Sequence, residues 1–222
     1  NAGEADIYII TALTNPAAKT RGISTFIIEK GMAGFSIGKK EKKLGIRGSA
    51  TCELIMDHVK VPFDNLLGKE NQGFKIALKT LDGGRIGIAA QAVGIAEGAI
   101  EAAVKYTKER KQFNRAIKDF QNTQFVLAEL ETKKEAAKLL TFEAAKLKDA
   151  NKPFGKEAAM AKLYAANVAM DVTTKALQLF GGYGYTRDYD IERMMRDAKI
   201  TEIYEGTNEA QKMVISAHML RS

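Results

Sequence analysis

Two long amphipathic stretches in the second half of the sequence leave little choice of fold. Residues 122–149 and 156–180 both repeat apolar side chains at helical spacing, and Pro153 falls just before the second stretch, where proline is common. The repeating positions are Val126, Leu130, Ala137, Leu140, Ala144 and Leu147 in the first stretch, and Ala159, Leu163, Ala166, Met170, Leu177 and Phe180 in the second. Because such stripes must be buried against other helices, they predict a helical bundle.

Shorter signals predict further helices around this pair. Residues 86–110 are rich in alanine, isoleucine and small residues, which suit close helix packing, and Leu81–Arg85 lies early in or between the helical segments of this region. A shorter helix is predicted over residues 191–197 and a final one over residues 208–220. Short loops between these segments agree with a bundle.

The first third of the sequence has a different character. Residues 7–13, 23–29 and 51–61 are short and rich in β-branched residues, with glycine-punctuated turns between them, so they predict antiparallel strands. The predicted fold class is therefore α+β and mainly α. An antiparallel β domain covers residues 1–66, and a C-terminal bundle of the four-helix type covers residues 67–222.

Composition narrows the chemistry. The 222 residues include one cysteine, Cys52, so there is no intrachain disulfide framework and a reducing compartment is expected. The two histidines, His58 and His218, lack metal-ligand spacing with each other or with Cys52, and we expect no metal site. The sequence also contains neither a serine nucleophile elbow nor a phosphate-binding P-loop.

The net charge of +7 indicates an anionic partner only weakly. The lysines are mixed with glutamates, as in Lys133–Glu135 and Glu143–Lys146, which is typical of solvated helix faces and not of a clustered nucleic-acid-binding stripe. A nucleotide or coenzyme fits the charge equally well. We expect no nucleic-acid partner, and no membrane partner because no apolar run looks long enough to cross a bilayer.

Four segments at predicted helix ends could carry chemistry, although each also has an ordinary structural interpretation. Glu205 lies between an aromatic residue and a glycine, just before the predicted N-cap Thr207. A carboxylate there can reach a ligand, but helix-start electrostatics alone also explain it. The other segments are Arg110–Arg115, whose guanidinium groups suit phosphates, Gln178–Gly184, whose glycines permit close backbone approach without forming a dinucleotide fingerprint, and Asp82–Arg85, where a ligand chain could pass.

Taken together and in this order, these segments resemble the acyl-CoA dehydrogenases, most closely their short-chain, butyryl-CoA branch. The resemblance covers essentially the whole chain, and several of its motifs are long. The matching stretches are Leu66–Phe74, Leu81–Ile88, Glu109–Phe113, Phe120–Gln124, Gln178–Tyr185, Glu192–Ile200 and Ile203–Thr207.

The resemblance implies an FAD-dependent enzyme that oxidises a short-chain acyl-CoA thioester to the trans-2-enoyl-CoA. Glu205 matches the base that removes the α-proton, while the flavin takes a hydride from the neighbouring carbon. One family branch places its base just before Arg85, but here that position is Gly84, which leaves Glu205. By motif, the substrate contacts are Asp82, Gly83, Gly84, Arg85 and Gly206, and the FAD contacts are Arg110, Gln121, Gln178, Leu179, Phe180, Gly181, Gly182, Thr207, Asn208 and Glu209.

The resemblance also implies a homotetramer, in which the Arg110 and Gln178–Gly182 segments serve a neighbouring subunit's flavin, and an electron-transferring flavoprotein as electron acceptor. The family carries an N-terminal helical domain and further β structure before the point matched by Asn1, so residues 1–66 are expected to be a partial β domain. Two alternatives stay open: an acyl-CoA oxidase of similar fold, and a non-catalytic oligomerising fragment. The implied compartment is the bacterial cytoplasm, or the mitochondrial matrix in a eukaryote.

Overall fold

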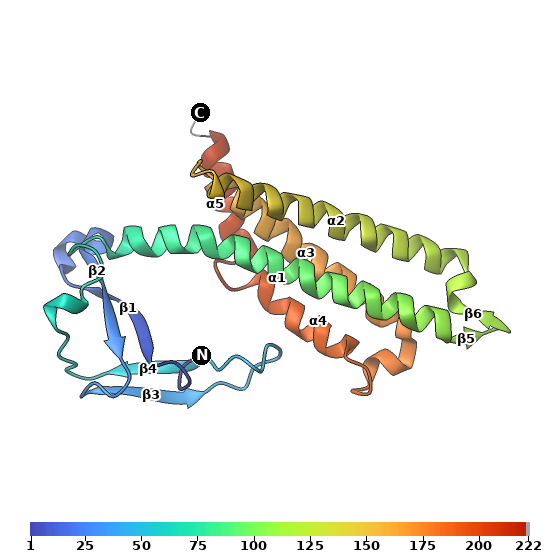
Figure 1. Ribbon diagram of the computed structural model, residues 1–222, viewed down its shortest axis with the longest axis horizontal. Coiled ribbons are helices and arrows are strands. Elements are labelled where there is room, and N and C mark those ends of the chain that lie inside the picture. The colour runs from blue at the N-terminus through green and yellow to red at the C-terminus, as the bar shows by residue number, and fades with distance from the viewer. Residues whose placement is uncertain (221–222) are drawn as a thin grey trace. The chain divides into compact units, whose positions relative to one another are not determined.

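The computed structural model describes residues 1–220, which are mainly helical (Figure 1). The chain forms two compact units, Asn1–Thr80 and Leu81–Ser222. The division falls inside the first long helix, α1 (Gly73–Glu109). The α+β, mainly α fold class is confirmed, whereas the domain boundary after residue 66 stays a prediction.

The first unit contains two antiparallel strand pairs. β1 (Ile7–Leu13) pairs with β2 (Ile23–Glu29) in a register that sets Ile10 opposite Phe26. β3 (Phe35–Lys40) pairs with β4 (Cys52–Met56). The two pairs are separate two-stranded sheets, and a 3₁₀ segment, η1 (Pro16–Gly22), connects β1 to β2.

The strand predicted over residues 51–61 ends early, so the second half of that prediction was wrong. β4 stops at Met56, and His58 has a φ of +53°, a left-handed conformation that an extended strand cannot contain. The Asp57 amide still donates to the Gly34 carbonyl at 2.9 Å, so the bend begins directly after the last bond between the strands. A 3₁₀ turn, η2 (Phe63–Asn65), follows Pro62.

The second unit contains the remainder of α1 and the other helices of the described chain. The helices predicted over residues 122–149, 156–180, 191–197 and 208–220 are confirmed, with bounds that differ by no more than two residues. They are α2 (Gln121–Asp149), α3 (Gly155–Phe180), α4 (Ile191–Lys199) and α5 (Asn208–Leu220). The connections contain the hairpin β5 (Lys111–Gln112) and β6 (Arg115–Ala116) and the 3₁₀ segments η3 (Ile117–Asp119), η4 (Gly181–Tyr185) and η5 (Ile200–Glu202).

Small side chains line the core of the bundle. On α1, residues with 0% exposure recur at spacings of three and four, which places them on one helix face: Ala89, Ala92, Ala96, Ala99 and Ala103. The core that they form continues over α2, α3 and α4. Because alanine projects little beyond the backbone, the helices can approach closely and hold the connecting segments in fixed positions.

By length and composition, α1 is able to cross a bilayer, with a mean hydropathy of 1.3 over an 18-residue window. The prediction that no apolar run is long enough was therefore wrong. Glycine and alanine separate the larger apolar side chains of this helix, so no run of large residues stands out in the sequence. In the structure, the stripe from Ala89 to Ala103 is buried in the core of the bundle, as in the central helix of a globular domain.

Candidate active site

The segment between η5 and α5 presents Glu205 on a left-handed backbone. Glu205 has a φ of +54° and Gly206 a φ of +88°. This region is natural for glycine but uncommon for glutamate, and such conformations concentrate at functional sites. Thr207 then begins α5, because its Oγ1 accepts a hydrogen bond from the Ala210 amide at 3.3 Å. The predicted N-cap is confirmed.

The Glu205 carboxylate lies against α1 at Gly84. A Cβ at position 84 would stand 2.9 Å from the Glu205 Cδ and closer still to Oε2, so only glycine leaves room for the carboxylate. Oε2 is buried and has no hydrogen-bond partner among the described residues. A buried carboxylate oxygen without a donor is unfavourable for stability, yet its lone pairs remain available to accept a proton.

Two buried side chains hold the backbone that carries this carboxylate. Gln211 on α5 donates from Nε2 to the Gly206 carbonyl at 2.8 Å and to the Glu205 carbonyl at 3.2 Å. Lys162 on α3 donates from Nζ to the Gly206 carbonyl at 2.8 Å and to Asn208 Oδ1 at 3.3 Å. Both side chains belong to residues that are 0% exposed. The two peptide groups are therefore fixed from α3 and α5 together.

The phenol of Tyr204 attaches the same segment to α1. Its hydroxyl forms a hydrogen bond with Gln91 Oε1. Burial raises the pKa of Tyr204 above its ordinary value, and the hydrogen bond opposes that shift. The phenol therefore stays protonated and keeps the residue beside Glu205 in place.

The predicted substrate segment lies on α1 beside this carboxylate. The Arg85 Nη1 donates to Asp82 Oδ1 at 2.5 Å, and Arg85 is 7% exposed. Arg85 Nε, Glu205 Oε2 and Gln211 Oε1 are all buried without a hydrogen-bond partner among residues 1–220. Gln211 contacts the Glu205 backbone, and Arg85 directly follows Gly84 on α1. Unpaired buried polar atoms are rare, so these three make the segment a candidate ligand site.

One pocket, here called the glycine pocket, contains most of the predicted FAD contacts. It has a volume of ≈ 510 Å³ and lies at the end of α1 and the junction of α3 with η4. The Arg110 guanidinium lies 5.2 Å from the centroid of the Tyr183 ring. A Cβ on Gly181 or Gly182 would meet no atom within 4 Å, so their backbone is open to a ligand. The predicted contacts in its lining are Arg110, Gln178, Leu179, Phe180, Gly181 and Gly182.

The other predicted FAD contacts do not line this pocket. Gln121 begins α2, and Thr207, Asn208 and Glu209 stand at the start of α5. Asn208 is 8% exposed, and its Nδ2 donates to Asn167 Oδ1 at 2.9 Å. Hydrogen bonds from its own amide and from the Thr207 hydroxyl lower the pKa of Glu209. The predicted set therefore divides among the glycine pocket, the start of α2 and the start of α5.

Sequence reasoning missed Lys162, Gln211 and Gln91. Lys162 carried a usable signal, because it lies three residues after Ala159 and four before Ala166, on the apolar stripe of α3. A lysine at such a position buries its ammonium group, which requires a polar or charged partner. The two glutamines carry no comparable signal, since their roles depend on contacts between distant parts of the chain.

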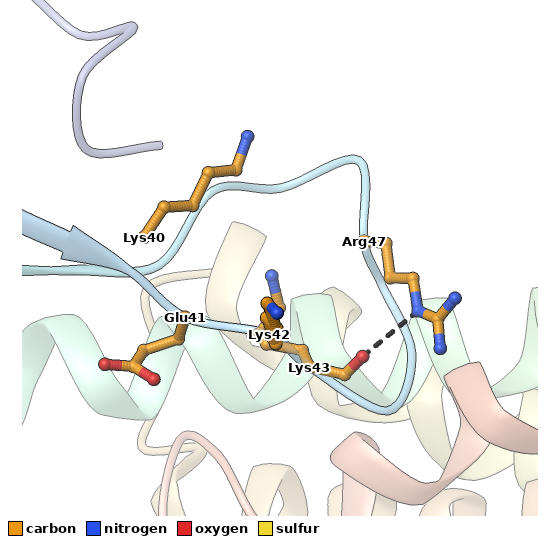
Figure 2. A pocket seen from close by; sticks show the side chains of 5 residues that line it. All are labelled: Lys40, Glu41, Lys42, Lys43 and Arg47. Atoms are coloured by element: carbon orange, nitrogen blue, oxygen red, sulfur yellow. Dashed lines mark hydrogen bonds between the residues drawn. The ribbon is translucent and has the colours of Figure 1, made fainter.

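Another pocket, of ≈ 560 Å³, lies in the first unit and contains no predicted site residue. It is lined by the last residue of β3, Lys40, and by Glu41, Lys42, Lys43 and Arg47 of the loop that follows (Figure 2). The Arg47 Nε donates to the Lys43 carbonyl at 3.1 Å and closes this loop. In residues 1–220, no group of three or more His, Cys, Asp or Glu side chains could hold a metal ion.

Comparison with family models gives the class of protein. The model for the C-terminal domain of acyl-CoA dehydrogenases matches residues 71–220, and the model for their middle domain matches residues 1–59. The chain therefore belongs to the acyl-CoA dehydrogenase family. The resemblance read from the motifs is confirmed.

Individual relatives fall in the short-chain branch. The chain is 61% identical over 221 residues to the short-chain specific acyl-CoA dehydrogenase of Clostridium acetobutylicum, covering 100% of this chain and 58% of the relative. It matches butyryl-CoA dehydrogenase of Megasphaera elsdenii with a TM-score of 0.98 and 54% identity, over 100% of this chain and 58% of that one. A chain in the structure of the electron transferring flavoprotein of Acidaminococcus fermentans matches with a TM-score of 0.99 and 58% identity, over the same shares. The chain thus spans 58% of the length of these relatives.

Proposed function

We propose that this chain carries the catalytic base and part of the cofactor site of an FAD-dependent dehydrogenase of short-chain acyl-CoA. The reaction is the α,β-dehydrogenation of a butyryl-CoA-like thioester to the trans-2-enoyl-CoA. The observation that carries the proposal is the Glu205 carboxylate, whose buried Oε2 lies against Gly84 without a hydrogen-bond donor.

Glu205 would accept the α-proton of the thioester at Oε2. An α-proton is too weakly acidic for a carboxylate in water, but a polarised thioester carbonyl and exclusion of water narrow that difference. The hydrogen bonds from Gln211 and Lys162 to the backbone at Glu205 and Gly206 keep the carboxylate from turning away during proton transfer. FAD, when bound, supplies the acceptor for the hydride that leaves the β-carbon.

The substrate would pass along α1 at Asp82–Arg85. The Asp82–Arg85 ion pair fixes the guanidinium, and the unpaired Arg85 Nε is available to a polar group of the ligand. Gly83, Gly84 and Gly206 carry no side chains that would block close approach. Acyl chain length is set by small differences, since one methylene is worth only about 1–3 kcal/mol of discrimination.

The residues of the glycine pocket fit part of FAD. A guanidinium group suits pyrophosphate oxygens, and the open backbone of Gly181 and Gly182 suits close approach of a flat or phosphate-bearing group. We assign Arg110 and Gln178–Gly182 to this role, with Gln121 and Thr207–Glu209 as the remaining contacts.

Assembly, electron acceptor and compartment complete the proposal. Exposed apolar side chains on α2, namely Phe125 at 59%, Leu139 at 69% and Phe142 at 54%, support burial against further copies in a homotetramer. The match to a chain in an electron transferring flavoprotein structure supports such a flavoprotein as acceptor. We place the protein in the bacterial cytoplasm, or in the mitochondrial matrix of a eukaryote.

Glu205→Gln tests the proposal in the FAD-loaded protein. The amide keeps the shape but accepts no proton, so we expect bleaching of the flavin by anaerobic butyryl-CoA to slow by about 10³-fold or more, while FAD content and butyryl-CoA binding stay unchanged. Glu129→Gln, on the surface of α2, is the matched control and should bleach at the rate of the unsubstituted protein. A loss in Glu205→Gln of no more than about tenfold, or ~1.4 kcal/mol, would show that another group is the base.

A second measurement separates the dehydrogenase from an oxidase of similar fold. After reduction by butyryl-CoA, the flavin of a dehydrogenase should reoxidise slowly in air and quickly with an electron-transferring flavoprotein. Rapid reoxidation in air alone would assign the chain to the oxidases. A colourless protein that stays colourless after FAD is added would favour an oligomerising fragment.

A further inference from the structure

Lys162 is a buried cation for which the structure supplies no counter-ion at contact distance. The residue is 0% exposed and is the largest side chain that is fully buried in the described chain. Its Nζ makes hydrogen bonds to the Gly206 carbonyl and Asn208 Oδ1, both neutral acceptors. No carboxylate of residues 1–220 lies within 4.0 Å of it, although other buried or half-buried lysines of the bundle have such partners.

Burying an ammonium group without a contacting carboxylate lowers stability, so an apolar residue would serve packing better at this position. The neighbours on the α3 stripe, Ala159, Ala166 and Ala169, are themselves apolar and 0% exposed. The lysine instead contributes a hydrogen bond at a fixed point: its shortest bond, at 2.8 Å, goes to the carbonyl of Gly206, the residue that follows Glu205.

Charged groups surround Lys162 at longer range. They are Glu202 on η5, Glu209 on α5, Arg85 on α1 and Glu205 itself. Burial is the dominant influence and lowers the pKa of Lys162 to about 8, while the three carboxylates oppose that shift and Arg85 adds to it. In the neutral pH range the ammonium therefore remains charged and keeps all its donors for the Gly206 carbonyl and Asn208 Oδ1.

We propose that Lys162 is a positioning residue for proton abstraction: it holds the Gly206 peptide so that the Glu205 carboxylate stays over Gly84. The inference rests on the proposed function, because it assumes that Glu205 is the base. It assigns to the α3 lysine a part in the reaction that requires no contact with substrate or FAD.

The first test is Lys162→Met in the FAD-loaded protein. Methionine fills much of the same volume without charge or donors. We expect FAD content to be unchanged, kcat for butyryl-CoA to fall by about tenfold or more, and KM to change by less than about threefold. A merely structural role would instead change KM or FAD content as much as kcat.

Lys134→Met is the matched control, since Lys134 is also buried but its ammonium contacts carboxylates on α2. Its kcat should stay within about threefold of the unsubstituted value. Lys162→Gln, which restores a hydrogen-bond donor without charge, should recover part of kcat. It also serves if Lys162→Met does not fold.

The outcomes separate this inference from the proposed function. A kcat within about threefold of the unsubstituted value in both Lys162 variants, or an equal fall of kcat in Lys134→Met, overturns the role of Lys162. If Glu205→Gln keeps full activity, the assignment of the base is wrong, and the role of Lys162 falls with it. If Glu205→Gln is inactive and kcat falls only in the Lys162 variants, both stand.

Discussion

Two buried lysines of the same helical unit are held in opposite ways. Lys134 on α2 is 5% exposed, and its Nζ lies 2.8 Å from Glu131 Oε1, 2.6 Å from Glu135 Oε1 and 3.8 Å from Glu97 Oε1. Hydrogen bonds to Glu131 and Glu135 raise the pKa of Lys134. Lys162 instead faces a backbone carbonyl and an amide oxygen, and burial lowers its pKa to about 8.

The difference separates a structural ion network, around Lys134, from a buried lysine to which we assign a functional role, Lys162. Around Lys134 the charge is balanced by half-exposed carboxylates, so the network fits two helices together and directs no group at a ligand. Around Lys162 the charge is balanced poorly, and the side chain fixes one peptide in a segment with two left-handed residues, Glu205 and Gly206. Unfavourable local features of this kind persist where function requires them.

Within this comparison, the largest expected effect comes from Gly84, which contacts the Glu205 segment that Lys162 holds. In Gly84→Ala the new methyl group would meet the Glu205 carboxylate, which must then move. We expect kcat/KM for butyryl-CoA to fall by about 10²–10³-fold, because small displacements of a reacting group have effects of this size. Steady-state kinetics of the FAD-loaded protein measure this loss of kcat/KM.

Gly87→Ala, three residues further along α1, is its control. A Cβ there would meet nothing within 4 Å, so the substitution should leave kinetics unchanged and raise the free energy of unfolding by about 0.5–1 kcal/mol through helix propensity. If both substitutions lowered kcat/KM equally, the effect would come from helix α1 as a whole and not from the contact with Glu205.

A second prediction concerns the pH dependence of stability. The pKa of Lys162 is about 8 when folded against an ordinary value of 10.5, so between these pH values the unfolded chain binds more protons and the free energy of unfolding rises with pH. The rise should approach about 3 kcal/mol and disappear in Lys162→Met. Urea unfolding followed by circular dichroism at pH 7.5, 9 and 10 measures it.

Lys134 should behave in the opposite sense. Its raised pKa means that its stabilising contribution is complete below pH 10.5 and is lost only above that value, so Lys134→Met should leave the slope between pH 8 and 10 unchanged. A slope that is lost in Lys134→Met and kept in Lys162→Met would reverse the comparison.

The smallest effects are expected among the carboxylates of the Lys134 network. Glu131→Gln or Glu135→Gln alone should lower the free energy of unfolding only slightly, because the remaining carboxylate still pairs with the ammonium and both are half-exposed. The double substitution should exceed the sum of the two, since the lysine then keeps only the distant Glu97. Additive effects would show that the network is solvated and unimportant.

The sequence predicted helices better than it predicted the site. The stripes of residues 122–149 and 156–180 fixed α2 and α3 because burial imposes a period of 3.6 residues on any helix in a bundle. The sequence predicts Leu81–Arg85 early in or between helical segments, whereas the structure places it inside the continuous α1. Two adjacent glycines weaken helix propensity locally, but packing along the rest of α1 overrides that weakness.

For the site, motif resemblance located Glu205 and the glycine pocket, but not what holds them. That Gly84 faces Glu205 depends on the approach of α1 to a loop 120 residues away, and no local pattern records it. Gln211 and Gln91 are ordinary in sequence and become informative only through their contacts. Lys162 is the exception, since a lysine on an apolar stripe is conspicuous without a structure.

The contact between Gly84 and the Glu205 carboxylate also couples substitutions at these two positions. A side chain at position 84 and a carboxylate reaching from position 205 compete for one volume, so a larger residue at position 84 requires the carboxylate to move. If a carboxylate were to arise on α1 at this point, a small residue at position 205 would leave room for it, and glycine there would also suit the left-handed backbone. The base is thus better regarded as belonging to a place in space than to a position in the chain.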